Sequence, residues 1–87
     1  MYYVYILHSE RFDKYYKGQT GNFPERIKRH NAGMEKSTAP YRPWTPIWVT
    51  QKPTKSEAVK LERKLKNLSR EKTLSFIEKF SQDKWKP

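Results

Sequence analysis

The chain has 87 residues, a formal net charge of +10, 34% hydrophobic residues and no cysteine. This length predicts one small domain with a modest core, which we expect over residues 1–81, with a frayed end at 82–87. The lack of cysteine excludes disulfide frameworks and thiolate metal sites. No segment resembles a signal peptide or a membrane span, so we expect a soluble, cytoplasmic protein with no membrane partner.

The positive charge is distributed over both halves of the chain and therefore belongs to the folded body. A field of this sign attracts polyanions and raises their encounter rate. Three Trp, six Tyr and four Phe are interleaved with the cations. This combination suits nucleic acid, because cations contact phosphates while rings stack on bases. The alternative is that the lysine-rich surface serves only to keep the protein in solution.

Residues 2–8 have the β-branched and aromatic composition of a strand. Alternate side chains point to opposite faces, and both faces are apolar or aromatic, with Tyr3, Tyr5 and Leu7 on one and Val4 and Ile6 on the other. The strand is therefore expected to be central. A second strand, 14–20, follows a turn at Asp13 and Lys14, and Gly18 within it permits a close approach.

A helix is expected after the second strand. Asn22 is a plausible N-cap and Pro24 falls in the first turn, where its missing N–H costs nothing. The helix should reach residue 30 or 31 and stop at Gly33.

The projection of this helix indicates which of its side chains face the protein. Phe23 and Ile27 are its packing residues, and Arg26 and His30 fall on the same arc of about 140°. We therefore expect Arg26 and His30 on the rim of the buried face. An arginine is costly to hold there unless it meets an anion.

Residues 32–46 contain three prolines and few periodic apolar residues, which predicts a long loop of the kind that often carries function. Within it, Arg42 is flanked in the sequence by two aromatic residues, Tyr41 and Trp44. A short third strand is expected at residues 47–50, ended by Pro53.

Two helices are expected after the third strand. Residues 54–57 match a capping box, and the helix that follows has an inward stripe of Ala58, Leu61, Leu65 and Leu68. Ser69 can cap a last helix whose inward residues are Leu74, Ile77 and Phe80.

Glu62 interrupts the apolar stripe of the first of these helices. One interpretation is a carboxylate at the edge of the stripe, paired with Arg63, Lys66 or another basic residue. The other is a ligand for a hard divalent cation, since Mg²⁺ binds through one or two carboxylates together with water and substrate phosphate.

The ordered set of motifs resembles the GIY-YIG nuclease domain, and specifically the small stand-alone bacterial members of that superfamily. The first motif corresponds to residues 3–5 and the second to residues 16–18. Arg26 and His30 match the helix that follows, residues 42–44 match the loop before the third strand, and Glu62 matches the metal-binding glutamate. The resemblance spans residues 2–78. It departs from the family at Tyr3, where the first motif has glycine, and at Lys17, where the second has an apolar residue.

The resemblance implies an α/β (α+β) fold, a small three-stranded antiparallel sheet flanked by about three helices. It also implies hydrolysis of phosphodiester bonds with one divalent cation, Mg²⁺ or Mn²⁺, held by Glu62. Tyr16 is the implied general base, supported by Tyr5, with a nearby cation and Arg26 favouring its phenolate. Arg26 is further implied to pair with phosphate oxygens, and His30 to relay protons or orient water.

Each of these roles has a structural alternative. Tyr5 and Tyr16 fit ordinary core aromatics, and His30 fits a packing or capping histidine near a helix end. For nucleic-acid binding the candidates are Arg42, Lys17, Trp44 and Tyr41, although the two rings also fit a core.

Two functions follow from the sequence. The first is a metal-dependent endonuclease that cleaves DNA, which is favoured over RNA as the substrate. The second is a nucleic-acid-binding module of the same fold with little or no turnover, working with a protein partner.

Overall fold

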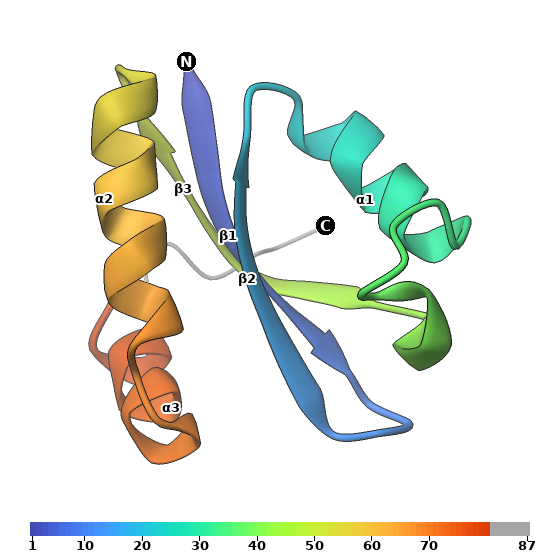
Figure 1. Ribbon diagram of the computed structural model, residues 1–87. Helices are drawn as coiled ribbons and strands as arrows, with labels where there is room; N and C mark the ends of the chain where they lie inside the picture. Colours follow the sequence, from blue (N-terminus) through green and yellow to red (C-terminus); the bar gives the residue numbers. More distant parts are fainter. Residues whose placement is uncertain (81–87) are drawn as a thin grey trace.

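The computed structural model describes residues 1–80. Their elements follow the order β1 (Tyr2–Ser9), β2 (Lys14–Thr20), α1 (Phe23–Asn31), the 3-10 turn η1 (Ala39–Tyr41), β3 (Thr45–Lys52), α2 (Lys55–Lys66) and α3 (Arg70–Lys79) (Figure 1). Within these residues the strands form one antiparallel sheet in the order β2-β1-β3, accompanied by three α-helices, which confirms the predicted fold class. None of the described helices is long and apolar enough to cross a membrane. The frayed end predicted at residues 82–87 lies outside the described part of the chain.

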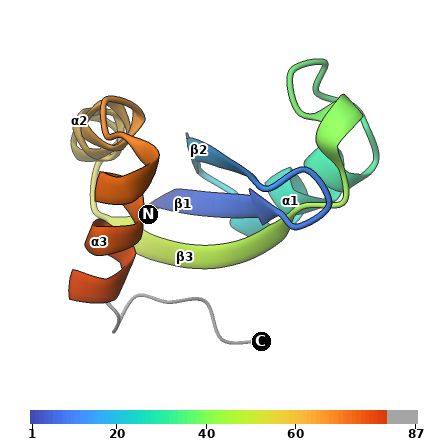
Figure 2. The same cartoon turned by 90° about the horizontal axis from the view of Figure 1, so that it is seen from below.

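Strand β1 is the centre of the fold, as its two apolar faces predict. Residues 4–7 have no exposed surface. Val4 and Ile6 pack in one core cluster with residues of α2 and α3, whereas Tyr5 and Leu7 pack in a second with residues of α1 and the loop that follows it. Figures 1 and 2 show this division, with α2 and α3 on one side of the sheet and α1 on the other. Each face of the sheet therefore has its own core.

Strand β3 is longer than the sequence predicts at both ends, because it spans Thr45–Lys52 rather than residues 47–50. Its pairing with β1 is shifted between Ile6 and Leu7, so that Ile6 faces Trp48 whereas Leu7 faces Pro46. An irregularity of this kind at a sheet edge accommodates a proline, which has no N–H to give to the sheet.

Both C-terminal helices have the predicted caps. The side chain of Thr54 accepts a hydrogen bond from the Glu57 amide, and that of Ser69 accepts one from the Lys72 amide. The stripe predicted for α2 is confirmed, with Ala58 and Leu65 buried and Leu61 and Leu68 packed against them, although Leu68 lies beyond the last residue of α2.

The face predicted for α3 is wrong at one position, because Leu74 is 44% exposed whereas Thr73 is buried. Thr73, Phe76, Ile77 and Phe80 form the face that packs, and Leu74 projects about 110° away from its centre. Burial of Thr73 is tolerated because its hydroxyl donates to the Ser69 carbonyl, 2.8 Å away.

Candidate active site

Tyr5 crosses the neighbouring strand because that strand has a glycine opposite it. Gly18 is the cross-strand partner of Tyr5 in β2. A Cβ atom at Gly18 would lie 2.5 Å from the Tyr5 hydroxyl oxygen and 2.7 Å from the ring carbon that carries it. Any other residue at position 18 would displace the phenol. Gly18 thus allows Tyr5 to extend over β2. This contact is the close approach that the sequence predicts at Gly18.

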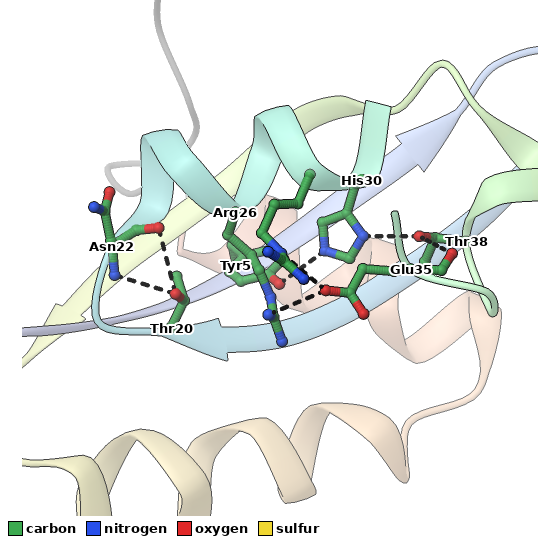
Figure 3. Close-up of polar contacts among 8 residues, drawn as sticks. Tyr5, Thr20, Asn22, Arg26, His30, Glu35 and Thr38 are labelled. Carbon is green, nitrogen blue, oxygen red and sulfur yellow. Dashed lines mark hydrogen bonds and ion pairs between the residues drawn. The ribbon is translucent and has the colours of Figure 1, made fainter. Parts of the chain in front are cut away.

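His30 holds the Tyr5 hydroxyl inside the protein. Its Nε2 lies 3.1 Å from the Tyr5 hydroxyl oxygen, and its Nδ1 lies 2.8 Å from Thr38 Oγ1 (Figure 3). The His30 side chain has no exposed surface, so the predicted position on the rim is wrong. A helical projection gives the direction of a side chain but not its depth, and here the loop after α1 closes over it.

The hydrogen bonds around His30 select one tautomer. Thr38 Oγ1 donates to the Glu35 carbonyl at 3.4 Å, so it accepts from His30 Nδ1–H. The Nε2 atom is then the acceptor, and the Tyr5 hydroxyl donates to it. Burial, with the Arg26 guanidinium acting in the same direction, lowers the pKa of His30 and keeps the ring neutral.

The loop over this histidine is fastened to α1 by Asn31. Asn31 Oδ1 accepts from the Trp44 amide at 2.6 Å, and Asn31 Nδ2 donates to the Trp44 carbonyl at 3.1 Å. Trp44 Nε1 in turn donates to the Thr38 carbonyl at 2.9 Å. Sequence reasoning missed Thr38, since a threonine in a loop carries no signal of its own before the fold is known.

Arg26 is held by a carboxylate that the sequence also did not indicate. Its NH1 lies 3.3 Å from Glu35 Oε1, which also accepts from Arg29 Nε at 3.2 Å (Figure 3). The Arg26 side chain is 36% exposed, which agrees with the predicted rim position. Its Nε is buried and, within the described residues, makes no hydrogen bond. Arg26 therefore keeps donor capacity beside the two phenols.

Tyr16 is the more accessible of the two phenols. Its ring packs edge-on against His30, with centroids 4.9 Å apart, and lies 6.2 Å from Trp44 and 6.3 Å from Tyr5. Within residues 1–80, no side chain or backbone group hydrogen-bonds its hydroxyl. The ring is thus fixed by its neighbours while the hydroxyl remains available to a ligand.

The environment disfavours ionisation of both phenols. Burial raises the pKa of Tyr5 to about 12, although the Arg26 guanidinium acts in the opposite direction. Burial also raises the pKa of Tyr16, and the Glu62 carboxylate adds to the effect while Arg26 opposes it. The expectation that Arg26 would favour the phenolate is therefore right in sign, but burial outweighs it.

Glu62 lies in α2, on the other side of the sheet from α1 (Figures 1 and 2). Its side chain is 18% exposed and its Oε1 lies 3.8 Å from Lys66 Nζ. This pairing is the one expected if Glu62 is a carboxylate at the edge of the apolar stripe rather than a metal ligand. Its charge nevertheless raises the pKa of Tyr5 and of Tyr16, so the carboxylate acts on both phenols. In residues 1–80, no three His, Cys, Asp or Glu side chains lie together as a metal site.

The residues predicted to contact nucleic acid do not form one surface. Trp44 is 4% exposed and belongs to the core with Tyr5, so its ring offers no face to a base and that prediction is wrong. Tyr41 is half-buried and has Lys14 Nζ 4.2 Å from its ring centroid. Arg42 is exposed, and its NH1 donates to the Ala39 carbonyl. Lys17 projects from the opposite face of β2, beside Ile6.

A family model described as the GIY-YIG catalytic domain matches residues 1–81. The UPF0213 protein SH2523 of Staphylococcus haemolyticus is 37% identical over 78 residues, which cover 88% of this chain and 94% of that protein. The UPF0213 protein OB0043 of Oceanobacillus iheyensis is 36% identical, with 88% and 90% covered. The solution NMR structure of the UPF0213 protein BH0048 from Bacillus halodurans has a TM-score of 0.59 and 34% identity, and 90% of this chain and 84% of that chain are covered.

Proposed function

Because this chain belongs to the GIY-YIG catalytic domain family, we propose that it is a metal-dependent endonuclease that hydrolyses phosphodiester bonds in DNA. The observation that carries the proposal is the pair of phenols beside Arg26. One phenol is held by His30, and the other has a hydroxyl without a partner among residues 1–80. A packed core requires only satisfied phenols, whereas an active site requires one that is available to substrate and water.

The two tyrosines have different roles in this proposal. Tyr5 donates to His30 Nε2, so its proton points away from the substrate and its oxygen lone pairs are left to accept from Arg26 or from water. Tyr16, as phenolate, takes a proton from the attacking water. The water oxygen bonds to phosphorus while the bond to the leaving oxygen breaks, and the leaving oxygen takes up a proton from solvent.

Arg26 neutralises charge on the non-bridging oxygens as the water attacks. Its ion pair with Glu35 fixes the guanidinium before substrate binds and leaves the Nε side available. His30 is a positioning residue in this scheme, since it contacts Tyr5 and is closed off from solvent.

The donor set fits one hard cation, Mg²⁺ or Mn²⁺. Glu62 offers carboxylate oxygens whose charge reaches both phenols, and a single carboxylate completed by water and substrate phosphate is a usual Mg²⁺ arrangement. When bound, the cation would neutralise phosphate charge and lower the pKa of groups around it. To hold the cation, Glu62 has to release Lys66, whose side chain is 52% exposed and can turn to solvent.

The alternative is a binding module of the same fold that acts on nucleic acid with a protein partner. Two observations favour it, the raised pKa of Tyr16 and the pairing of Glu62 with Lys66. In a binding module both phenols stay protonated and Glu62 stays a surface carboxylate. RNA then becomes as suitable a ligand as DNA, since phosphate contacts do not distinguish the two.

Nicking of supercoiled, branched and single-stranded DNA with Mg²⁺ or Mn²⁺ tests the proposal. We expect Glu62→Gln to abolish cleavage, because the substitution removes the charge that holds the cation and nearly preserves the side-chain volume. Glu10→Gln is the matched control, since Glu10 is exposed in the turn between β1 and β2. Cleavage by Glu62→Gln at the wild-type rate contradicts the site. Salt-sensitive binding by wild type without cleavage of any substrate supports the binding module.

A further inference from the structure

A polar concavity lies on the face of the sheet opposite Tyr5 and Tyr16. It has a volume of about 280 Å³ and is lined by Asp13, Lys14, Tyr15, Lys17, Arg70 and Thr73. These residues come from the turn before β2, the first half of β2 and the first turn of α3, which the fold brings together. We call it the β2–α3 cavity.

Lys17 is the cation of this cavity that, among the described residues, is paired with neither a carboxylate nor an aromatic ring. Arg70 is paired with Asp13, through NH2 to Oδ2 and NH1 to the backbone carbonyl. The same carboxylate also accepts from His8 Nε2 at 3.0 Å, so its charge is fully engaged. Lys14 places its ammonium over the Tyr41 ring. Lys17 remains, and within the described residues no carboxylate lies within ion-pair distance of its Nζ.

The Lys17 side chain is also half-buried. Its side chain packs beside the core, and burial lowers its pKa. Its hydrogen bond within the described residues is to the Leu68 carbonyl at 3.4 Å, a long contact for a group with three donors. A cation held this way in a cavity is stabilised by an incoming anion, which restores the lost solvation.

The cavity and the candidate active site share one edge of the sheet. β2 is an edge strand, and Tyr16 and Lys17 are consecutive residues of it that project to opposite faces. A polyanion that crosses this edge meets Tyr16 and Arg26 on one face and Lys17 with Arg70 on the other. A free phosphate ion would occupy one face alone.

We propose that the β2–α3 cavity binds a second backbone phosphate of the same nucleic-acid strand that places a phosphate at Tyr16 and Arg26. This inference rests on the proposed function for the identity of the strand. It adds a contact, on the far face of β2, that fixes the strand across the sheet edge and carries no base specificity.

The salt dependence of binding to a labelled single-stranded oligonucleotide, in EDTA and in a Tyr16→Phe background, tests this contact without cleavage. Lys17→Met keeps the aliphatic stem and removes the charge. We expect it to weaken binding several-fold and to reduce the slope of log K against log salt by about 0.7, the value for one phosphate contact on a single strand. The control is Lys60→Met, at an exposed position of α2 outside the cavity.

An unchanged slope for Lys17→Met overturns the proposal. An equal loss of affinity and slope in Lys60→Met also overturns it, because the loss would then reflect only the overall positive charge of the protein. If Lys17→Met does not fold, NMR of the Tyr16→Phe protein decides. The amides of Arg70 and Thr73 should shift with the oligonucleotide, and a lack of shifts overturns the proposal. Shifts with inorganic phosphate but not with oligonucleotide also overturn it. Failure of the proposed function would be seen in a different measurement, the nicking assay, as a lack of cleavage by the wild-type protein.

Discussion

The Tyr5 hydroxyl oxygen and His30 Nε2 lie 3.1 Å apart in the interior, where neither side chain has any exposed surface. Thr38 accepts from the other ring nitrogen of His30, so the proton between the pair belongs to Tyr5. The two phenols are therefore unequal. Tyr5 is committed to a buried partner, and Tyr16 is left as the phenol whose hydroxyl faces the substrate in our account.

Replacement of Thr38 by valine should loosen this arrangement. Thr38→Val keeps the shape of the side chain but leaves His30 Nδ1–H without an acceptor, at a cost of about 1–3 kcal/mol in the free energy of unfolding. The tautomer preference of His30 should weaken with it. Urea unfolding gives the first quantity, and the ¹⁵N shifts of the His30 ring give the second.

Thr38→Ser provides the matched control, because it restores the hydroxyl and removes only a methyl group. It should recover the tautomer and most of the stability. An unchanged His30 tautomer in Thr38→Val would contradict the proton arrangement described above.

A methyl group at Gly18 should displace Tyr5. The added Cβ of Gly18→Ala would stand 2.5 Å from the Tyr5 hydroxyl oxygen, so the ring has to move. We expect a loss of about 1–3 kcal/mol in unfolding free energy, the usual cost of overpacking, and loss of cleavage. Gly21→Ala is the control, since its Cβ would meet Tyr2 at an ordinary 3.6 Å. Equal effects of the two substitutions would contradict the role of Gly18.

His30 should remain neutral in the folded protein at mildly acidic pH. Burial lowers its pKa below the ordinary value of 6.5, while the unfolded chain takes up a proton at that ordinary value. The unfolded state thus binds more protons below pH 6.5, and stability falls as pH decreases from there through the folded pKa. NMR titration of the His30 ring, with unfolding measured at several pH values, checks both statements. A folded-state pKa above 6.5 would contradict them.

The sequence predicts the frame of the site well, because strand alternation and local capping determine it. The strong alternation in β1 places Tyr5 correctly, and Asn22, Thr54 and Ser69 cap their helices as predicted. These are local properties of the chain, which neighbouring residues decide.

What the sequence does not predict depends on the loop after α1. Thr38 and Glu35 lie in a loop without periodic residues, and only the folded loop brings them to His30 and Arg26. The same closure places Trp44 in the core rather than at a nucleic-acid surface. The exposure of Leu74 has a similar origin, since the orientation of α3 on the sheet decides which of its faces packs.

The pH dependence of DNA nicking by wild type and Tyr16→Phe decides whether Tyr16 is the general base. Cleavage needs the Tyr16 phenolate, whose pKa is raised by burial, so the wild-type rate should rise with pH. Tyr16→Phe should lose about 10²–10⁴-fold in rate and the pH dependence with it. Tyr2→Phe, on the opposite face of the sheet, should behave as wild type. Wild-type rates and an unchanged pH profile in Tyr16→Phe would contradict the account.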